Sequence, residues 1–152
     1  MEILFPRVDG QSLSGTTHQL PGTLAGDRNL LLIAFKQSQQ SDVDTWVPLA
    51  EAIDAETTGF RAYELPVISH LYRPVSGFID GGMRGGIPDP QVRESTITLY
   101  INRKQFLTDL RIAEVDAIVP MLVTPAGEIL WRTTGRRTEQ AEASLRQVVA
   151  ET

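Results

Sequence analysis

A run of polar side chains that could bind an anion or a peptide carbonyl lies between a buried apolar segment and an amphipathic one. Its members are Gln37, Ser38, Gln40, Ser41 and Asp42. We expect Ser41 or Asp42 to cap a helix that runs to about residue 55, because such side chains accept hydrogen bonds from the first helical N–H groups. The other unpaired N–H groups and the positive end of the helix dipole would hold a carboxylate, a phosphate or a peptide carbonyl. The alternative is that Ser41 and Asp42 only cap the helix, since an acidic cap repels an anion.

The chain contains no cysteine, which excludes thiol catalysis, disulfides and cysteine-ligated zinc. Its two histidines, His18 and His70, lie in different segments and lack the His-Glu-x-x-His spacing of a zinc site. Ser41 or Ser69 together with His70 could supply two members of a Ser-His-Asp triad. The sequence, however, has no Gly-x-Ser-x-Gly motif. We therefore expect no metal, no cofactor and no catalytic residue.

Other side chains of the same predicted helix have both a functional and a structural interpretation. Paired carboxylates perform acid–base chemistry when they are desolvated, but on an amphipathic helix they are more typical of the solvated face. Trp46 and Trp131 are expected to fill the core or its rim, and stacking of Trp46 on a ligand is the alternative. The carboxylates concerned are Asp42, Asp44, Glu51, Asp54 and Glu56.

A glycine-rich segment, residues 81–90, contains four glycines, two prolines and Arg84. It matches neither the dinucleotide-binding fingerprint nor the P-loop, because no Gly-Lys-Ser/Thr sequence follows. The composition is more typical of a surface loop than of a phosphate site. Arg84 could still contact an acidic partner.

The hydrophobic pattern predicts the elements that must position these residues. Residues 29–35 form a continuous apolar run, which is typical of a strand buried on both faces. The helix after it should be kinked at Pro48, because proline removes a backbone donor and crowds the preceding turn. Thr138 is expected to cap the last helix. The other predicted elements are strands over 60–68, 96–101, 117–124 and 128–133 and helices over 69–78 and 103–110.

The order of these elements predicts an α/β sandwich with a mixed central sheet. Early alternation of strands and helices implies parallel pairing through right-handed crossovers, and the last two strands should form an antiparallel hairpin. We expect residues 1–152 to form a single domain, in which residues 1–19 are an extended or irregular N-terminal segment.

Three segments carry a likeness to a known superfamily. Residues 20–27 precede the first buried strand, Pro48 interrupts the helix that follows it, and residues 118–123 form an apolar run with Pro120 that leads to Gly127. In this order they resemble the thioredoxin-like superfamily, in particular its peroxiredoxin and thiol-disulfide oxidoreductase branch. The resemblance implies a three-layer α/β/α sandwich with a mixed central sheet, and it makes the helix with Pro48 the counterpart of the active-site helix.

Pro120 corresponds in this resemblance to the cis-proline of the superfamily. A cis bond would turn the backbone of Val119 toward the helix start, where the superfamily pairs that backbone with an extended peptide. The resemblance therefore implies that Val119 and Pro120 bind a peptide by strand addition. The alternative is that Pro120 only shapes the fold.

The chain departs from the superfamily at the position of the redox cysteines. Residues 37–43 occupy that position and include no thiol. A thiolate is the nucleophile in peroxide reduction and disulfide exchange, and a serine hydroxyl cannot replace it. Thiol peroxidase and disulfide oxidoreductase activities are therefore not carried over.

A second resemblance involves residues 63–67, 83–88 and 127–132, followed by Gly135. These segments are similar to the mitochondrial ATP synthase assembly factor of the same superfamily. That family is taken to bind a membrane-protein client without evident redox chemistry. The resemblance implies a role as an assembly factor or a chaperone-like protein.

Charge and hydropathy exclude several partners. The net charge of -5 argues against nucleic acid and anionic lipid, both of which require a clustered basic surface. The longest apolar stretch, residues 30–35, is too short to cross a membrane, and the first residues show no secretory signal. We expect a cytoplasmic protein without direct membrane insertion, and the sequence leaves open whether it forms a homodimer.

These observations favour a non-redox binding protein that holds a protein or peptide client. The predicted binding residues are those of the 37–42 run named above, with Trp46, Arg84, Val119 and Pro120. The alternative is an enzyme that uses thiol-independent chemistry on a small anionic substrate in the same cleft. The lack of a clustered nucleophile, base and orienting group favours binding.

Overall fold

The computed structural model describes residues 3–69, 79, 81–83 and 94–152. The N-terminal part contains β1 (Val8–Ser12), β2 (Thr17–Leu20), β3 (Arg28–Ala34), the short 3-10 helix η1 (Gln37–Gln39), α1 (Gln40–Asp44), α2 (Val47–Glu56) and β4 (Phe60–Ser69). The C-terminal part contains β5 (Ile97–Ile101), α5 (Arg103–Asp109), β6 (Val119–Val123), β7 (Ile129–Arg132) and α6 (Glu139–Glu151).

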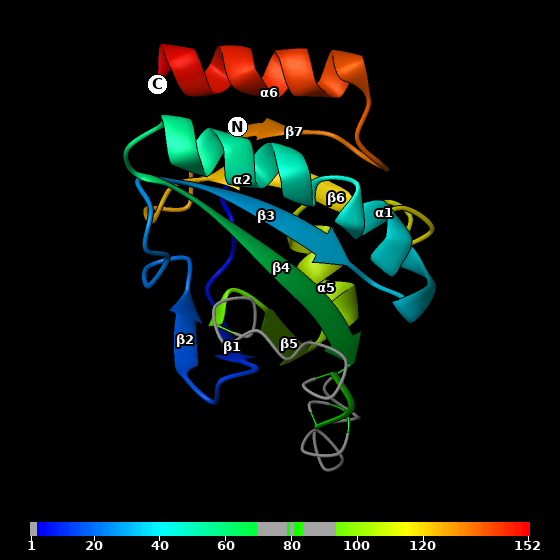
Figure 1. Ribbon diagram of the computed structural model, residues 1–152. Coiled ribbons are helices and arrows are strands. Elements are labelled where there is room, and N and C mark those ends of the chain that lie inside the picture. The colour runs from blue at the N-terminus through cyan, green and yellow to red at the C-terminus, as the bar shows by residue number, and fades with distance from the viewer. Residues whose placement is uncertain (1–2, 70–78, 80, 84–93) are drawn as a thin grey trace.

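A mixed seven-stranded sheet forms the centre of the molecule, with strand order β2-β1-β5-β4-β3-β6-β7 (Figure 1). Strand β4 is parallel to both β3 and β5. The other neighbouring pairs are antiparallel. The predicted strands, the early parallel crossovers and the final hairpin are therefore confirmed.

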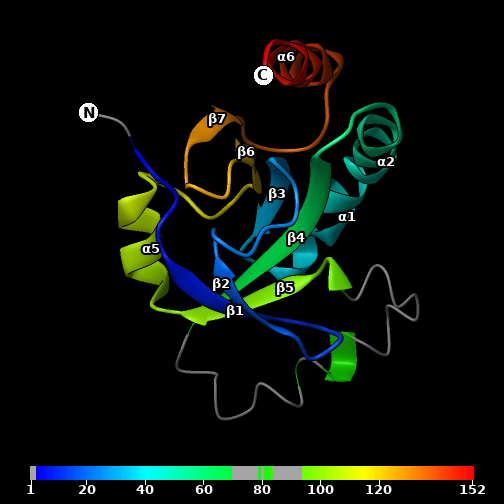
Figure 2. The same ribbon diagram turned by 90° about the vertical axis from the view of Figure 1, so that its left-hand side faces the viewer.

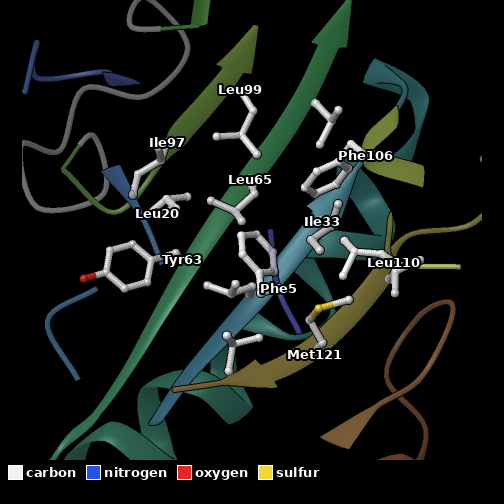
Figure 3. Close-up of a cluster of buried hydrophobic side chains, with 14 of the residues drawn as sticks. Phe5, Leu20, Ile33, Tyr63, Leu65, Ile97, Leu99, Phe106, Leu110 and Met121 are labelled. Carbon is white, nitrogen blue, oxygen red and sulfur yellow. The ribbon is translucent and has the colours of Figure 1, made fainter. Parts of the chain in front are cut away.

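Helices cover both faces of this sheet, which confirms the three-layer α/β/α sandwich. Helices α1, α2 and α6 lie on one face and α5 lies on the other (Figures 1 and 2). Leu30 and Leu32 of β3 pack into the cluster beneath α2 and α6. Leu31 and Ile33 point the opposite way, into the cluster beneath α5 that Figure 3 shows. The continuous apolar run is required because successive strand side chains alternate between two covered faces.

The N-terminal segment is more ordered than its sequence suggested. Strands β1 and β2 form an antiparallel hairpin, and β1 also pairs with β5. Gly10 allows the close approach, because a Cβ atom at this position would lie 2.5 Å from Cγ2 of Ile97. The segment over residues 1–19, expected to be extended or irregular, therefore includes strand β1 and most of β2, a hairpin that the sequence did not predict. The hairpin lies at the edge of the sheet, where polar residues are tolerated.

The predicted kinked helix is two separate helices. Helix α1 ends at Asp44, and α2 begins at Val47 with Pro48 in its first turn. Proline is tolerated there because the N–H groups of the first turn have no intrahelical acceptor. Pro48 therefore starts a helix instead of bending one.

Two expectations fall partly or wholly on residues outside the described ones. The helix predicted over residues 69–78 cannot be compared, except that Ser69 is the last residue of β4. In the predicted glycine loop, residues 81–83 are helical, and the rest of the segment, including Arg84, lies outside the described residues. The expected cap of the last helix is confirmed, since the N–H of Ala141 donates to Oγ1 of Thr138 at 3.1 Å.

Candidate functional site

The turn after β3 is held by Gln39, which the sequence did not single out. Its Oε1 atom accepts from the N–H groups of Phe35 at 2.9 Å and Lys36 at 3.3 Å. Its Nε2 atom donates to the carbonyl of Val115 at 2.7 Å, and the side chain is buried. The N-cap residue of α1 is Gln39 and no side chain caps this helix, so the expected cap by Ser41 or Asp42 is wrong. A buried glutamine within a polar run has no sequence signal that separates it from its exposed neighbours.

The other polar residues of the run lie at the surface around this turn. Gln37, Ser38, Gln40 and Ser41 are exposed, and Asp42 is half-buried. Asp42 stands in the first turn of α1, where its carboxylate disfavours an anionic ligand. Binding by these five residues remains a prediction.

Val119 and Pro120 do not form the open edge that the resemblance implied. The carbonyl of Ile118 accepts from Gly135 N–H and that of Pro120 from Thr133 N–H, both at 2.9 Å. Because main-chain groups alternate in direction along a strand, those of Val119 point to β3, where Val119 lies opposite Ile33. The strand is therefore paired on both sides, and strand addition at Val119 is wrong.

The expected cis bond is also absent at this position. Among the described residues the cis peptide bond is Leu20–Pro21, so the Val119–Pro120 bond is trans. Pro120 continues an extended strand opposite Leu32 and is itself buried. The alternative interpretation, in which Pro120 shapes the fold, fits this placement.

Trp46 is a core residue and not a surface for stacking. Its side chain is fully buried, and Nε1 donates to the carbonyl of Gly135 at 3.1 Å. Its ring meets that of Trp131 edge-on, with centroids 6.0 Å apart. The structural interpretation is therefore correct, because the buried ring has no free face on which a ligand could stack.

A cavity that the sequence did not predict lies beside the first half of β4. It has a volume of about 680 Å³. Strand β4 is twice as long as β5, and their pairing starts only with the bridge between Glu64 and Thr96. Among the described residues, none forms a strand beside residues 60–63 on that side. We call this space the β4 cavity; its lining comprises His18, Thr23, Ala25, Leu32, Val47, Ala50, Glu51, Asp54, Arg61, Ala62, Tyr63, Glu64, Glu94 and Ser95.

The main chain of Ala62 points toward the β4 cavity. Glu64 directs its N–H away from β3, since it donates to the carbonyl of Ser95 at 2.9 Å. Residues two apart on a strand direct their main-chain groups the same way, so Ala62 does likewise. The carbonyl of Phe60, two residues earlier, accepts from Nη1 of Arg61 at 2.8 Å. Within the described part of the chain no such partner reaches the N–H or C=O of Ala62 on this side.

Tyr63 closes the cavity on the other face of the sheet. Its ring belongs to the cluster beneath α5, and its hydroxyl points away from the other labelled side chains in Figure 3. That hydroxyl accepts from the N–H of Ala25 at 3.1 Å. The bond fixes the loop after β2 against β4, so one wall of the cavity is ordered.

Four carboxylates line the cavity, namely Glu51, Asp54, Glu64 and Glu94. Asp54 pairs with Arg61 at 3.3 Å, and Glu94 lies 3.5 Å from Nε2 of His18. A hydrogen bond from Ser14 is the main cause that lowers the pKa of Glu94. Among the described residues no cation pairs with Glu51 or Glu64 within salt-bridge distance.

Glu64 is the carboxyl of this lining whose pKa is raised. Burial raises its pKa, the nearby negative charge of Asp44 raises it further, and a hydrogen bond from Gln40 acts in the opposite direction. Glu64 therefore connects the cavity to α1, so the polar turn and the cavity meet at one carboxylate. A half-buried carboxylate in this position suits a cationic ligand.

The part of the chain that the structure describes contains neither a candidate metal site nor a candidate membrane-spanning helix. Its His, Asp and Glu side chains form no group of three that could hold a metal ion. None of its helices combines the length and apolar character that a bilayer crossing requires.

Comparison with known proteins identifies the fold. No family model matches the sequence, and no curated protein matches it. A putative electron transfer protein from Aquifex aeolicus superposes with a TM-score of 0.70 at 10% identity, over 98% of this chain and 96% of that one. BsSco, a member of the Sco family of cytochrome c oxidase assembly proteins, gives 0.64 at 13% identity over 100% and 96%.

A thiol-disulfide oxidoreductase thioredoxin domain from Bacteroides vulgatus gives a TM-score of 0.61 at 16% identity, with 98% of each chain covered. Likeness at these identities shows the fold and nothing more. The thioredoxin-like expectation from the sequence is confirmed at that level.

Proposed function

Because this chain has the thioredoxin-like fold and no cysteine, we propose that it is a non-redox binding protein that holds a protein or peptide client. The β4 cavity is the observation that carries the proposal. It combines about 680 Å³ of open space with a strand segment that no other strand of the described residues pairs with on one side. Exposed strand edges bind extended peptides through main-chain hydrogen bonds.

The polar turn extends this surface. Gln40 joins the two regions through its hydrogen bond to Glu64. A client segment that leaves the cavity past Glu64 would contact Gln37, Ser38 and Ser41. This arrangement keeps the predicted turn residues as binding residues in place of Val119 and Pro120.

A role in binding a client without oxidising it agrees with the absence of a thiol from the turn after β3. Disulfide exchange needs a thiolate, and the chain supplies none. BsSco, one of the similar structures, belongs to a family of assembly proteins. We extend to this chain the idea of an assembly-factor or chaperone-like role, in which a client is held and not oxidised.

The alternative is an enzyme with thiol-independent chemistry, and Glu64 is the observation that favours it. A half-buried carboxyl whose pKa is raised is a candidate general acid. The four carboxylates of the cavity disfavour the anionic substrate expected from the sequence. This alternative therefore requires a neutral or cationic substrate.

An array of synthetic peptides tests the proposal directly. The full chain is titrated into fluorescently labelled pentapeptides, in the presence and absence of a reductant, and binding is followed by fluorescence polarisation. We expect saturable binding of a subset of peptides with the same affinity under both conditions. Absence of binding to every peptide, or turnover of a small substrate that Glu64→Gln abolishes, contradicts the proposal.

A further inference from the structure

The unpaired segment of β4 and the carboxylates around it select one kind of ligand. We propose that the β4 cavity binds an extended client segment that carries a lysine or arginine side chain. This inference rests on the proposed function and names the chemistry of the client. The segment places its main chain against Ala62 and its cationic group beside Glu64 and Glu51.

Main-chain pairing is available at one residue. The N–H and C=O of Ala62 both point toward the cavity, because Glu64 directs its own N–H to Ser95 on that side. A client residue that presents both its groups to Ala62 forms the two hydrogen bonds of an antiparallel pair. Arg61 already occupies the carbonyl of Phe60, so the pairing cannot extend past that residue.

The length of the free edge agrees with a short segment. Residues 60–63 span roughly 13 Å at about 3.3 Å per residue. The volume of about 680 Å³ lies within the range of roughly 300–1,000 Å³ found for ligand sites. The cavity therefore has room for a few residues and one long side chain.

The charged groups that line the β4 cavity determine which client side chain fits there. Arg61 is the cationic group of the lining and pairs with Asp54, and Nε2 of His18 lies 3.5 Å from Glu94. Glu51 and Glu64 remain without a cation at salt-bridge distance in the described residues, and Asp44 adds a third negative charge near Glu64. A lysine or arginine side chain neutralises this excess and can lay its methylene groups against Val47 and Ala50 on the cavity wall.

The alternatives to a cation are disfavoured by the same groups. A glutamate side chain would add a negative charge beside partly buried carboxylates, where screening is weak. A neutral isostere such as norleucine fills the same space and leaves the carboxylates unpaired. Comparison of lysine, norleucine and glutamate at one peptide position therefore isolates the charge.

The first experiment uses three labelled pentapeptides, Ala-Thr-Lys-Val-Ala and its norleucine and glutamate versions, with the full chain. We expect the lysine peptide to bind at least tenfold more tightly than the norleucine peptide and the glutamate peptide to bind least. Glu64→Gln should reduce the lysine preference at least threefold. Glu114→Gln is the matched control, since it removes the same charge from an exposed residue outside the cavity and should leave the preference unchanged.

The second experiment tests the main-chain pairing. Ala62→Pro removes the N–H that faces the cavity, and Ala62→Gly keeps it. Proline is tolerated on a strand where the N–H lies on an unpaired side, so both variants should give the circular dichroism of a folded chain. We expect at least a tenfold loss of affinity for the proline variant and less than threefold for the glycine variant. N-methylation of the central peptide residue should cause a similar loss with the unchanged protein, which keeps the test valid if Ala62→Pro fails to fold.

The outcomes separate this inference from the proposed function. Binding that is equally tight for all three peptides, or unaffected by both backbone changes, overturns the inference and leaves a peptide-binding protein. Absence of binding to any peptide overturns both. A concentration-dependent dimer that Ala62→Pro abolishes and that peptides do not dissociate assigns the edge to a second copy of the chain and also overturns the inference.

Discussion

The N–H of Glu64 donates to the carbonyl of Ser95 at 2.9 Å, and this bond marks the point at which β4 acquires β5 as a neighbour. Before it, residues 60–63 pair with β3 and with no other strand in the part of the chain that the structure describes. The side chain of the same glutamate lies in the wall of the cavity that this difference in strand length creates. Glu64 therefore marks the end of the free edge and also places a carboxyl group in the cavity wall.

Stability should depend on the ionisation of Glu64. Its pKa is raised above the ordinary value of 4.5, so the folded chain binds its proton more tightly than the unfolded chain does. This contribution is fully present below about pH 4.5 and is lost as pH rises through the raised pKa. Glu64→Gln, which removes this dependence, should raise Tm at pH 7.5 and change it little at pH 4.

Thermal melts of both proteins from pH 4 to pH 8 measure this difference. Glu114→Gln serves as the exposed control. A Glu64→Gln variant that is less stable than the parent at pH 7.5 would show that the ionised carboxylate is stabilising, contrary to this account.

Gln39 should be the most important polar residue of the turn after β3. Gln39→Ala leaves the N–H groups of Phe35 and Lys36 and the carbonyl of Val115 without their partner. We expect a loss of about 1–3 kcal/mol in the free energy of unfolding. Urea denaturation measures it, with Gln37→Ala as the exposed control that should change by less than about 0.5 kcal/mol. Equal effects of the two substitutions would be inconsistent with the role of Gln39 in holding the turn after β3.

Trp46 should contribute to stability and not to ligand contact. Trp46→Phe keeps an aromatic ring and leaves the carbonyl of Gly135 without the indole N–H. We expect a loss of about 1–3 kcal/mol in unfolding free energy, with peptide affinity unchanged within twofold when measured well below Tm. Trp131→Phe is the comparison, because its indole bonds to the exposed Ser144 and should matter less. A large loss of affinity with normal stability would restore Trp46 as a contact residue.

Pro120 should be dispensable for binding. Its strand is paired with β3 on one side, and Thr133 and Gly135 occupy its carbonyl edge on the other. Pro120→Ala is therefore expected to leave the affinity for the lysine peptide unchanged within twofold. Fluorescence polarisation with a folded variant checks this, and a tenfold loss would return the binding site to β6.

The sequence predicted the framework of the fold because its signals are local. The apolar run that became β3, the crossover order and the cap at Thr138 all follow from periodicity and capping chemistry. The hairpin of β1 and β2 was missed because its residues are mostly polar, and its pairing with β5 joins segments about 85 residues apart in the chain.

The candidate site was harder to predict because it depends on register. The β4 cavity exists because β4 extends past β5, and no residue type at Ala62 or Ser95 signals that offset. The resemblance predicted a binding site at Pro120, but strand β6 is hydrogen-bonded on both sides at that residue. The burial of Gln39 and Glu64 likewise arises from packing between distant segments, which spacing alone does not show.

Backbone amide NMR of the labelled chain, with and without the lysine peptide, tests the central claim most directly. If the client segment pairs with the free edge of β4, the amide of Ala62 should shift and its hydrogen exchange should slow at least tenfold. The amides of Val119 and Met121 should remain unchanged, because β6 is already paired. Protection at Val119 without any change at Ala62 would contradict the account.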